Sequence, residues 1–271
     1  MTEQEYNAAE GVRRSDLWKM EDSPEKFRYF LDHPAEQTPA MAFGSACHKV
    51  ILEPETFTNE YAVAPAGIDR RTKAGKEAWE SFMAYAAGKT IVSAEDMAVM
   101  MEMKEQLEKC PLARELLFGQ TGQNEVALFW KDPETGEKCK VKIDRLIRTG
   151  DETIVIDYKT AQAADTARFN NEVWRLGYYF QAGMYTEGLK HLWTGNRARF
   201  IFVVQEKKAP YAVNVVEVSE DVMKAGVAKF HELLQKYHDC KEADIWPGYV
   251  DGDLPNETTL PGWFSLDGED E

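Results

Sequence analysis

The sequence predicts an α/β (α+β) fold in which helices flank a mixed central β-sheet. Hydrophobic residues recur at helical spacing through the first third of the chain. The middle then changes to alternating and β-branched runs that are typical of strands. The expected order is helices, three strands, a helix, two strands and a helix. This order favours a mixed sheet with helices packed on it.

The N-terminal third is expected to be helical. Ser23 followed by Pro24 is a helix start, with serine as the N-cap and proline at the first helical position. The segment 54–75 has no clear period and is expected to be irregular. We expect helices at residues 24–32, 40–52, 75–87 and 93–108.

The rest of the chain supplies the sheet. Turn residues at 132–136 and 149–152 separate three strand-like runs, so these runs are expected to form antiparallel neighbours. We expect strands at 125–131, 138–148, 153–159, 198–205 and 212–218, and helices at 166–190 and 219–239.

Composition indicates a globular chain of 271 residues, 44% of them hydrophobic. No apolar run reaches the roughly 18 residues of a membrane span. The acidic N-terminus lacks the apolar core of a signal peptide. We therefore expect a cytoplasmic protein with no membrane association. Four widely spaced cysteines are expected to be buried free thiols rather than a disulfide framework or zinc site: Cys47, Cys110, Cys139 and Cys240.

The net charge of −15 argues against a nucleic-acid binder, which usually has a basic footprint. Eight acids and no Lys or Arg lie in 244–271, so residues 1–243 carry only −7. A metal-dependent nuclease also needs clustered carboxylates, so nucleic acid is not excluded. We expect one domain over 1–243, with a helical part at 1–118 and a core at 119–243. An acidic tail follows.

The tail contains aromatic residues as well as acids, and we expect part of it to lie on the domain. Its aromatic residues are Trp246, Tyr249, Trp263 and Phe264. The last five residues are acidic or glycine, and we expect them to be disordered.

The third expected strand ends in charged residues. Side chains alternate along a strand, so Asp157 and Lys159 share one face with Val155, and Tyr158 points to the other. Charges at the end of an otherwise apolar strand cost desolvation unless they are paired or bind a ligand. A local salt bridge between Asp157 and Lys159 is one interpretation, and a ligand site is the other.

The second expected strand adds another carboxylate. Lys142, Asp144 and Leu146 should share one face, and counting from the turn near residue 150 puts Asp144 opposite Asp157 within about a residue. Such neighbours lie roughly 4.5–5.5 Å apart between Cβ atoms. Two opposed carboxylates destabilise a sheet unless a divalent cation lies between them. Alternatively, Asp144 pairs with Arg145 or Lys142.

These residues resemble the D…(D/E)-x-K site of the PD-(D/E)XK nuclease superfamily. Asp144 is followed thirteen residues later by Asp157-Tyr158-Lys159. Gln181 and Tyr185 form a Q-x-x-x-Y pattern, one helical turn apart on the following helix. The resemblance implies a restriction-endonuclease-like core with a helical N-terminal part.

A second resemblance is closer in sequence. His48 lies in the run Phe43 to His48 (FGSACH), which is similar to the helical histidine of RecB-type exonucleases. The segments at 15–27, 70–73 and 177–182 resemble the nuclease domains of the exodeoxyribonuclease VIII (RecE) family. The likeness extends over about 13–240, and the tail is not part of it.

The resemblance implies a role for each residue. Asp144 and Asp157 would bind Mg²⁺ with the backbone carbonyl of Tyr158, and His48 would reach the same metal. A nitrogen ligand suits Mn²⁺ at least as well as Mg²⁺. Lys159 would hold the attacking water or stabilise charge on phosphorus. His48 could instead be an ordinary helix histidine.

Other residues would complete the site. Glu125 could bridge a second metal or be a surface acid on an edge strand. Gln181 and Tyr185 would contact DNA or brace the site, with core packing as the alternative. A basic cluster would contact DNA phosphates or simply be solvated: Arg70, Arg71, Lys73 and Lys76.

The function implied by the resemblance is a metal-dependent exodeoxyribonuclease that acts on ends of double-stranded DNA. It would resect 5′→3′ in phage-type recombination, beside a single-strand annealing recombinase, and form a ring-like homo-oligomer, a tetramer. No glycine-rich phosphate loop is present, so ATP is not expected. Only Cys240 lies late in the chain, so no iron–sulfur cluster is expected. Alternatives are a non-catalytic DNA-binding module of the same fold, an endonuclease and a Cas4-like nuclease.

Overall fold

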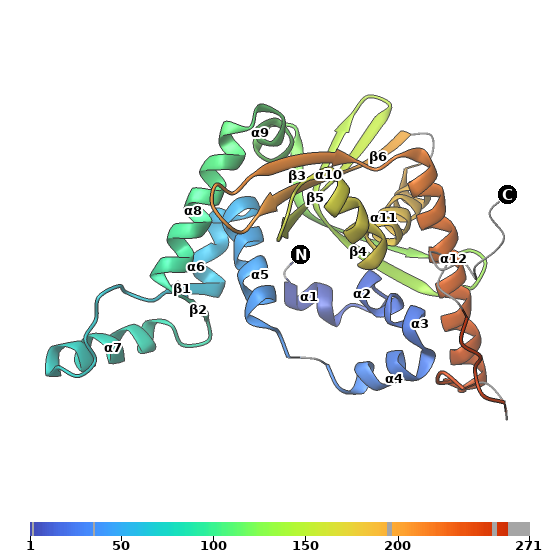
Figure 1. The fold of residues 1–271 in the computed structure, drawn as a ribbon, viewed down its shortest axis with the longest axis horizontal. Helices are drawn as coiled ribbons and strands as arrows, with labels where there is room; N and C mark the ends of the chain where they lie inside the picture. Colours follow the sequence, from blue (N-terminus) through green and yellow to red (C-terminus); the bar gives the residue numbers. More distant parts are fainter. Residues whose placement is uncertain (2, 35, 194–196, 251–253, 260–271) are drawn as a thin grey trace, which may run out of the picture.

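The fold is built on a five-stranded mixed sheet in the order β3-β4-β5-β6-β7 (Figure 1). The computed structural model describes residues 1, 3–34, 36–193, 197–250 and 254–259. The strands are β3 (Gly122–Lys131), β4 (Lys138–Thr149), β5 (Glu152–Ala161), β6 (Arg197–Glu206) and β7 (Val213–Glu217). Only β5 and β6 pair in parallel, and the other neighbours are antiparallel. The predicted mixed sheet flanked by helices is therefore confirmed.

Helices cover both faces of the sheet (Figure 1), and the sheet therefore separates two main clusters of core residues. One face is covered by α10 (Thr166–Arg175), α11 (Tyr178–Leu192) and α12 (Glu220–Ala243), and the other by α5 (Pro39–Leu52), α8 (Ala94–Lys109) and α9 (Pro111–Phe118). Along β5, Val155 packs in the first cluster, whereas Ile156 and Tyr158 pack in the second. The predicted alternation of this strand is confirmed.

The N-terminal part begins with four short helices, and a strong sequence signal marks the start of the fourth alone among them. They are α1 (Glu3–Ala8), α2 (Arg14–Leu17), α3 (Lys19–Asp22) and α4 (Pro24–Asp32). The start of α4 agrees with the prediction, because the Ser23 hydroxyl accepts a hydrogen bond from the Lys26 backbone N–H at 3.2 Å. Between α1 and α2 the chain pairs with β4 through a bridge from Val12 to Cys139.

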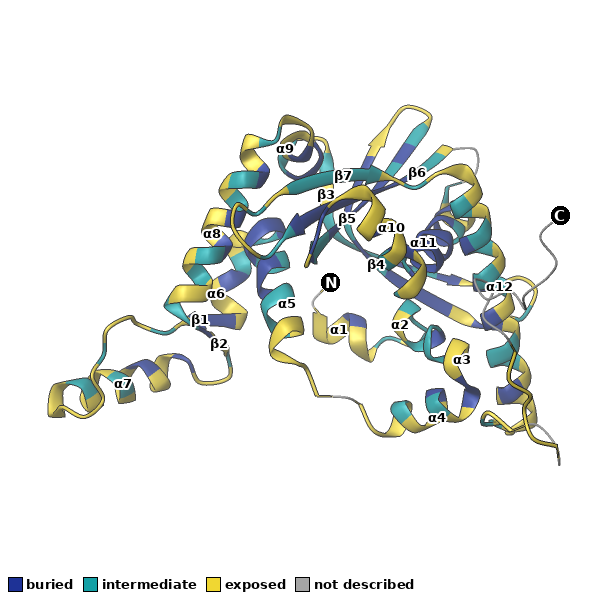
Figure 2. Ribbon diagram, in the orientation of Figure 1, coloured by how far each residue is buried: buried dark blue, intermediate teal, exposed yellow. Residues whose placement is uncertain are grey.

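The segment after α5 is more ordered than expected. It contains η1 (Pro54–Thr56), α6 (Phe57–Glu60) and β1 (Tyr61–Val63), so the prediction of an irregular 54–75 was wrong at its start. The chain then forms α7 (Lys73–Tyr85) and returns as β2 (Thr90–Val92), parallel to β1. We call residues 64–89 the arm, because α7 projects away from the sheet (Figure 1) and is mostly exposed (Figure 2).

The expected long helix at 166–190 is in fact two helices that meet at Gly177. This residue has φ +66°, and a Cβ atom there would lie 2.6 Å from the Trp18 ring. Only glycine allows both the left-handed backbone and this close approach. Helical spacing on either side of Gly177 does not reveal the break.

Part of the tail lies on the domain, as predicted. Trp246 stacks on Phe27 with ring centroids 5.5 Å apart, and the Glu25 backbone N–H donates to the Pro247 carbonyl at 3.1 Å. Trp263, Phe264 and the last five residues lie outside the described residues.

The cysteines are free thiols, three of them buried and Cys110 half-buried. The prediction of buried free thiols is therefore confirmed except for the partial exposure of Cys110. None of the helices in the described part of the chain combines the length and apolar character needed to cross a bilayer.

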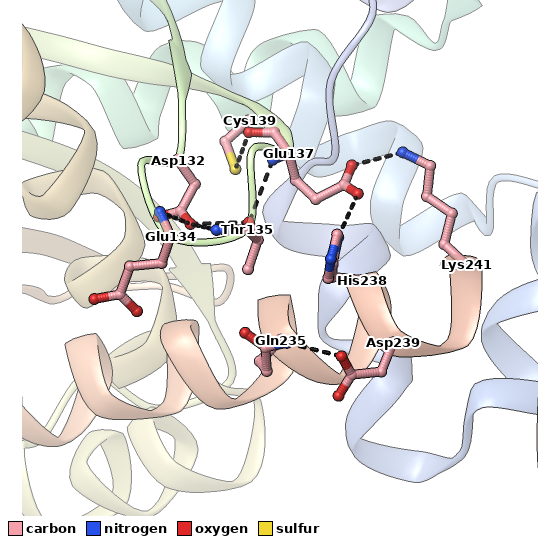
Figure 3. Close-up of polar contacts among 9 residues, drawn as sticks. All are labelled: Asp132, Glu134, Thr135, Glu137, Cys139, Gln235, His238, Asp239 and Lys241. Atoms are coloured by element: carbon pink, nitrogen blue, oxygen red, sulfur yellow. Dashed lines mark hydrogen bonds and ion pairs between the residues drawn. The ribbon is translucent and has the colours of Figure 1, made fainter. Parts of the chain in front are cut away.

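The turn between β3 and β4 is fixed to α12 by an ionic contact that we call the Glu137 clamp (Figure 3). Glu137 lies 3.0 Å from Nδ1 of His238 and accepts a hydrogen bond from Nζ of Lys241 at 2.7 Å. Within the turn, Asp132 Oδ2 accepts from the Thr135 backbone N–H at 2.8 Å. The clamp holds the start of β4, the strand that carries Asp144.

Candidate functional site

The site lies where β4 and β5 separate. The two strands pair from Thr149↔Glu152 to Arg145↔Ile156, and beyond this point β5 pairs with β6 alone. Asp144 and Asp157 are the next residues on each side of the fork. The predicted opposition of the two aspartates therefore agrees with the register. Both carboxylates line a cavity of about 1300 Å³.

Asp157 is held among partners on β5 and α11. Its Oδ2 atom lies 2.5 Å from Nζ of Lys159, and its Oδ1 atom accepts a hydrogen bond from the Gln181 amide. Oδ2 is buried and accepts no hydrogen bond of good geometry. The Lys159 ammonium also lies 4.8 Å from the centre of the Tyr178 ring. The local ion pair considered from sequence is present, but inside the cavity.

Asp144 lies on β4, on the opposite side of the fork from Asp157. Its Oδ2 atom accepts the Tyr158 backbone N–H at 2.9 Å and lies 3.4 Å from Nδ1 of His48 on α5. Arg145 instead donates to the Leu116 carbonyl, so the alternative in which it pairs with Asp144 does not hold. The same is true of Lys142, whose partners are glutamates. The role of the Tyr158 carbonyl as a ligand stays a prediction.

Tyr158 also fixes this part of β5, through contacts on the face of the sheet that packs in the second core cluster. Its side chain is fully buried in the second core cluster, and its hydroxyl donates to Gln205 Oε1 at 2.8 Å. The Gln205 amide in turn donates to the Met103 carbonyl of α8 at 2.9 Å. A buried hydrogen-bond chain therefore limits the movement of the peptide that holds Asp144.

The alternation expected for β4 breaks at the fork. Val141, Ile143 and Leu146 all pack in the first core cluster, so the prediction that Leu146 shares a face with Lys142 and Asp144 was wrong. On the partner strand β3, the ladder is interrupted at Glu125, whose φ is +53°. Left-handed backbone at a non-glycine residue is strained and persists where the surroundings enforce it.

Glu125 is not a plain surface acid. Its side chain is 18% exposed, lines the cavity, and lies 2.5 Å from Nζ of Lys142. Burial and then the nearby Asp144 raise the pKa of Glu125. Three carboxylates from three neighbouring strands thus face one cavity, each at a local break in the sheet.

The charges in the site are unbalanced. Burial, followed by the Asp157 carboxylate, raises the pKa of Asp144 to about 8. Burial lowers the pKa of His48, with Lys159 acting in the same direction, so the imidazole is neutral near pH 7. Burial alone would lower the pKa of Lys159, but Asp157 outweighs it and the pKa is raised. Lys159 therefore stays an ammonium ion.

These residues fit a divalent cation. Buried opposed carboxylates favour a cation between them, a neutral imidazole is a competent ligand, and Asp157 Oδ2 has an acceptor position to offer. No three His, Cys, Asp or Glu side chains form a ready-made cluster in the part of the chain that the structure describes. The Lys159 ammonium pairs with Asp157, and the neutral His48 ring lies 3.4 Å from Asp144 Oδ2.

The other predicted site residues divide into two groups. Gln181 and Tyr185 line the cavity, where Gln181 braces Asp157 and Tyr185 packs against Phe200. The basic cluster does not line it: Arg70, Arg71, Lys73 and Lys76 are exposed on the arm. No signal in the sequence indicates that this segment leaves the domain before α7.

Sequence reasoning missed a row of lysines on β4. Lys138, Lys140 and Lys142 alternate along the strand and all contact the N-terminal segment. The run KCKVK has the period of two that puts three charges on one face of a strand, and that signal could have identified them. Lys140 and Lys142 line the cavity.

A mixed sheet with this fork, two opposed aspartates and a lysine two residues after the second defines a PD-(D/E)XK type of protein. A family model agrees: residues 14–252 match the family described as a PDDEXK-like domain of unknown function (DUF3799). The chain belongs to this family.

A solved structure shares the fold. A protein from Eubacterium rectale, provisionally described as an exonuclease, is 12% identical, with a TM-score of 0.61 and 96% of each chain covered. The protein SSO0001 is 15% identical, covering 71% of this chain and 85% of its own, at a TM-score of 0.30. No curated protein matches the sequence.

Proposed function

We propose that the protein is a metal-dependent exodeoxyribonuclease that hydrolyses phosphodiester bonds at the ends of double-stranded DNA. The observation that carries the proposal is the fork between β4 and β5. It presents Asp144 and Asp157 to a cavity of about 1300 Å³, with Lys159 Nζ 2.5 Å from Asp157. Membership of a PDDEXK-like family supports the same chemistry.

Each residue has a distinct part in this reaction. Asp144 and Asp157 would hold Mg²⁺ or Mn²⁺, with His48 favouring Mn²⁺. A divalent ion there supplies a water of lowered pKa and stabilises charge on the phosphate. Lys159, an ammonium ion by its raised pKa, would orient the water or bind a phosphate oxygen. Gln181 holds Asp157 in place through its amide.

Further features are proposed from the family resemblance described above. The enzyme would degrade the 5′-ended strand, leave 3′ single-stranded tails and serve phage-type recombination beside a single-strand annealing protein. It would act as a ring-like homo-oligomer, which light scattering of the purified protein tests. Contact of the exposed basic cluster on the arm with DNA backbone is part of the same proposal.

The test is cleavage of end-labelled linear duplex DNA and of covalently closed circular DNA. Wild-type protein with Mg²⁺ or Mn²⁺ should shorten the linear duplex and leave the circle intact, and EDTA should stop the reaction. Asp157→Asn should be inactive while keeping the fold. Labels at the 5′ and 3′ ends of separate substrates give the direction.

Other results would select an alternative. Cutting of the circle would indicate an endonuclease. DNA binding without cleavage by wild-type protein under either metal would indicate a non-catalytic module. A brown colour with absorbance near 400 nm would favour an iron–sulfur nuclease of the Cas4 kind.

A further inference from the structure

The N-terminal segment lies along the lysine row of β4. Glu10 reaches Lys138 at 2.5 Å, and Glu3 reaches Lys142 at 2.7 Å. Between them, Nζ of Lys140 donates to the backbone carbonyls of Tyr6 and Asn7. Residues 3–10 therefore cover every lysine of the row.

Lys142 is the member of the row closest to the fork. It precedes Asp144 by two residues, lines the cavity, and has Nζ 2.5 Å from Glu125 and 2.7 Å from Glu3. Glu125 belongs to the sheet and to the candidate site. Glu3 belongs to α1, a six-residue helix, and its side chain is 56% exposed.

The two ends of α1 differ in how firmly they are held. Near the C-terminal end, Tyr6 is buried, packs against Phe129, and its carbonyl accepts the Lys140 ammonium. At the N-terminal end, the contacts of Glu3 are polar, with Lys142 and with Asn7 of its own helix. Because the Glu3 carboxylate is 56% exposed, this ion pair contributes little to stability, and another anion can replace the carboxylate at a small cost in free energy.

We propose that Lys142 binds a phosphate of the nucleic-acid substrate and that the Glu3 carboxylate of α1 occupies this position until the substrate enters. The inference rests on the proposed function, because it takes the occupant of the cavity to be a phosphodiester chain. Phosphate and carboxylate compete for the same ammonium group, since both accept charge-assisted hydrogen bonds. The first turn of α1 is thus an internal competitor for the substrate.

The experiment compares two substitutions of equal charge. Glu3→Gln removes the carboxylate that contacts Lys142 inside the cavity. Glu10→Gln removes the carboxylate that contacts Lys138, and neither of these two residues lines the cavity. Binding to a fluorescent DNA duplex is measured in EDTA over a series of salt concentrations. The proteins compared are wild type, Glu3→Gln, Glu10→Gln, Lys142→Gln, Lys142→Arg and the double variant Glu3→Gln/Lys142→Gln.

The proposal predicts a specific pattern of dissociation constants. Glu3→Gln should bind about two- to fivefold more tightly than wild type, and Glu10→Gln should change binding much less. Lys142→Gln should bind more weakly and lower the salt slope by about 0.9, whereas Lys142→Arg should keep the slope. In the Lys142→Gln background, Glu3→Gln should have no further effect.

Three results would overturn the proposal: equal tightening by Glu3→Gln and Glu10→Gln, an undiminished effect of Glu3→Gln without Lys142, or no binding by any of the proteins. Urea unfolding of each variant shows whether weak binding reflects loss of the fold. Cleavage with Mn²⁺ separates the two proposals. If the protein cleaves DNA but the binding pattern is absent, only the proposed role of Glu3 is contradicted. If the binding pattern is present but no DNA is cleaved, only the proposed hydrolysis is contradicted.

Discussion

Two carboxylates, the buried Glu137 and the half-buried Asp144, lie just before the start and in the middle of β4, and they differ in what surrounds them. Glu137, one residue before the strand begins, lies between His238 and Lys241 of α12. Asp144, in its middle, faces Asp157 across the fork and has only the Tyr158 N–H and the neutral His48 beside it.

The pKa values move in opposite directions as a result. Burial would raise the pKa of Glu137, but the hydrogen bonds from Lys241 and His238 outweigh it and the pKa is lowered. For Asp144, burial and the Asp157 charge act together, and the pKa rises to about 8. A carboxylate with its hydrogen-bond partners in place holds structure together. Asp144 and Asp157 share a single lysine, Lys159, which pairs with Asp157, and under the proposed function a bound cation would supply the remaining positive charge.

The largest effect is expected at the fork. Asp157→Asn keeps an acceptor for the Gln181 amide but removes the charge that would hold the metal, so cleavage of linear DNA should fall by about 10³-fold or more. The matched control is Glu137→Gln, which should cleave at the wild-type rate. Equal loss of cleavage in both proteins would contradict the claim that Asp157 has a catalytic role and Glu137 a structural one.

The next effect is a gain in stability. Asp144→Asn should raise the free energy of unfolding by about 1–3 kcal/mol at pH 8 in EDTA, because it removes a buried charge opposed by another. The folded pKa of about 8 lies above the ordinary 3.8, so wild-type stability from this group is lost as pH rises between those values. Urea unfolding at pH 4 and pH 8 should show the gain only at the higher pH.

Glu137→Gln should lower the free energy of unfolding, the opposite of the effect expected for Asp144→Asn. We expect a loss of about 1–2 kcal/mol at pH 7, because the Lys241 ammonium and the His238 ring lose their partner at the junction of the β3–β4 turn with α12. The folded pKa is below the ordinary 4.5, so the contribution is present above 4.5 and lost as pH falls through the lowered value. Unfolding curves of variant and wild type should therefore converge in acid, and a constant difference would contradict this account.

The smallest effect is expected from Lys241→Met. The side chain of Lys241 is 49% exposed and His238 remains beside Glu137, so the loss should be about 0.5 kcal/mol or less. Thermal unfolding at low and high salt measures it. A loss as large as that of Glu137→Gln would mean that Lys241 alone, without His238, sets the strength of the clamp.

Much of the sheet could be predicted because strands and tight turns leave local signals. Counting from the turn near Gly150 was enough to oppose Asp144 and Asp157, because antiparallel register follows from turn position. The break at Glu125 was not predictable, since a left-handed glutamate has no sequence signature and is enforced by its surroundings.

The parts that were missed depend on tertiary contacts. Helix α1 is too short to form on its own, and contacts such as that of Lys140 with the Tyr6 carbonyl fix it in place. Gly177 divides a helix because the Trp18 ring lies where a side chain would be. Arg70 and Arg71 could be recognised as basic, but not placed on the arm, because nothing local states where the chain leaves the domain.

The arm leaves and rejoins the domain through two strands that lie side by side, with Tyr61 beside Thr90. Its own small apolar cluster, which includes Phe82 and Ala86, is separate from the two clusters that support the sheet. Insertions or replacement modules within residues 64–89 would therefore leave the two clusters that support the sheet intact, whereas Tyr61 at the junction itself lines the cavity. The arm is therefore a position where natural variation or protein engineering could add new recognition elements without changing the sheet.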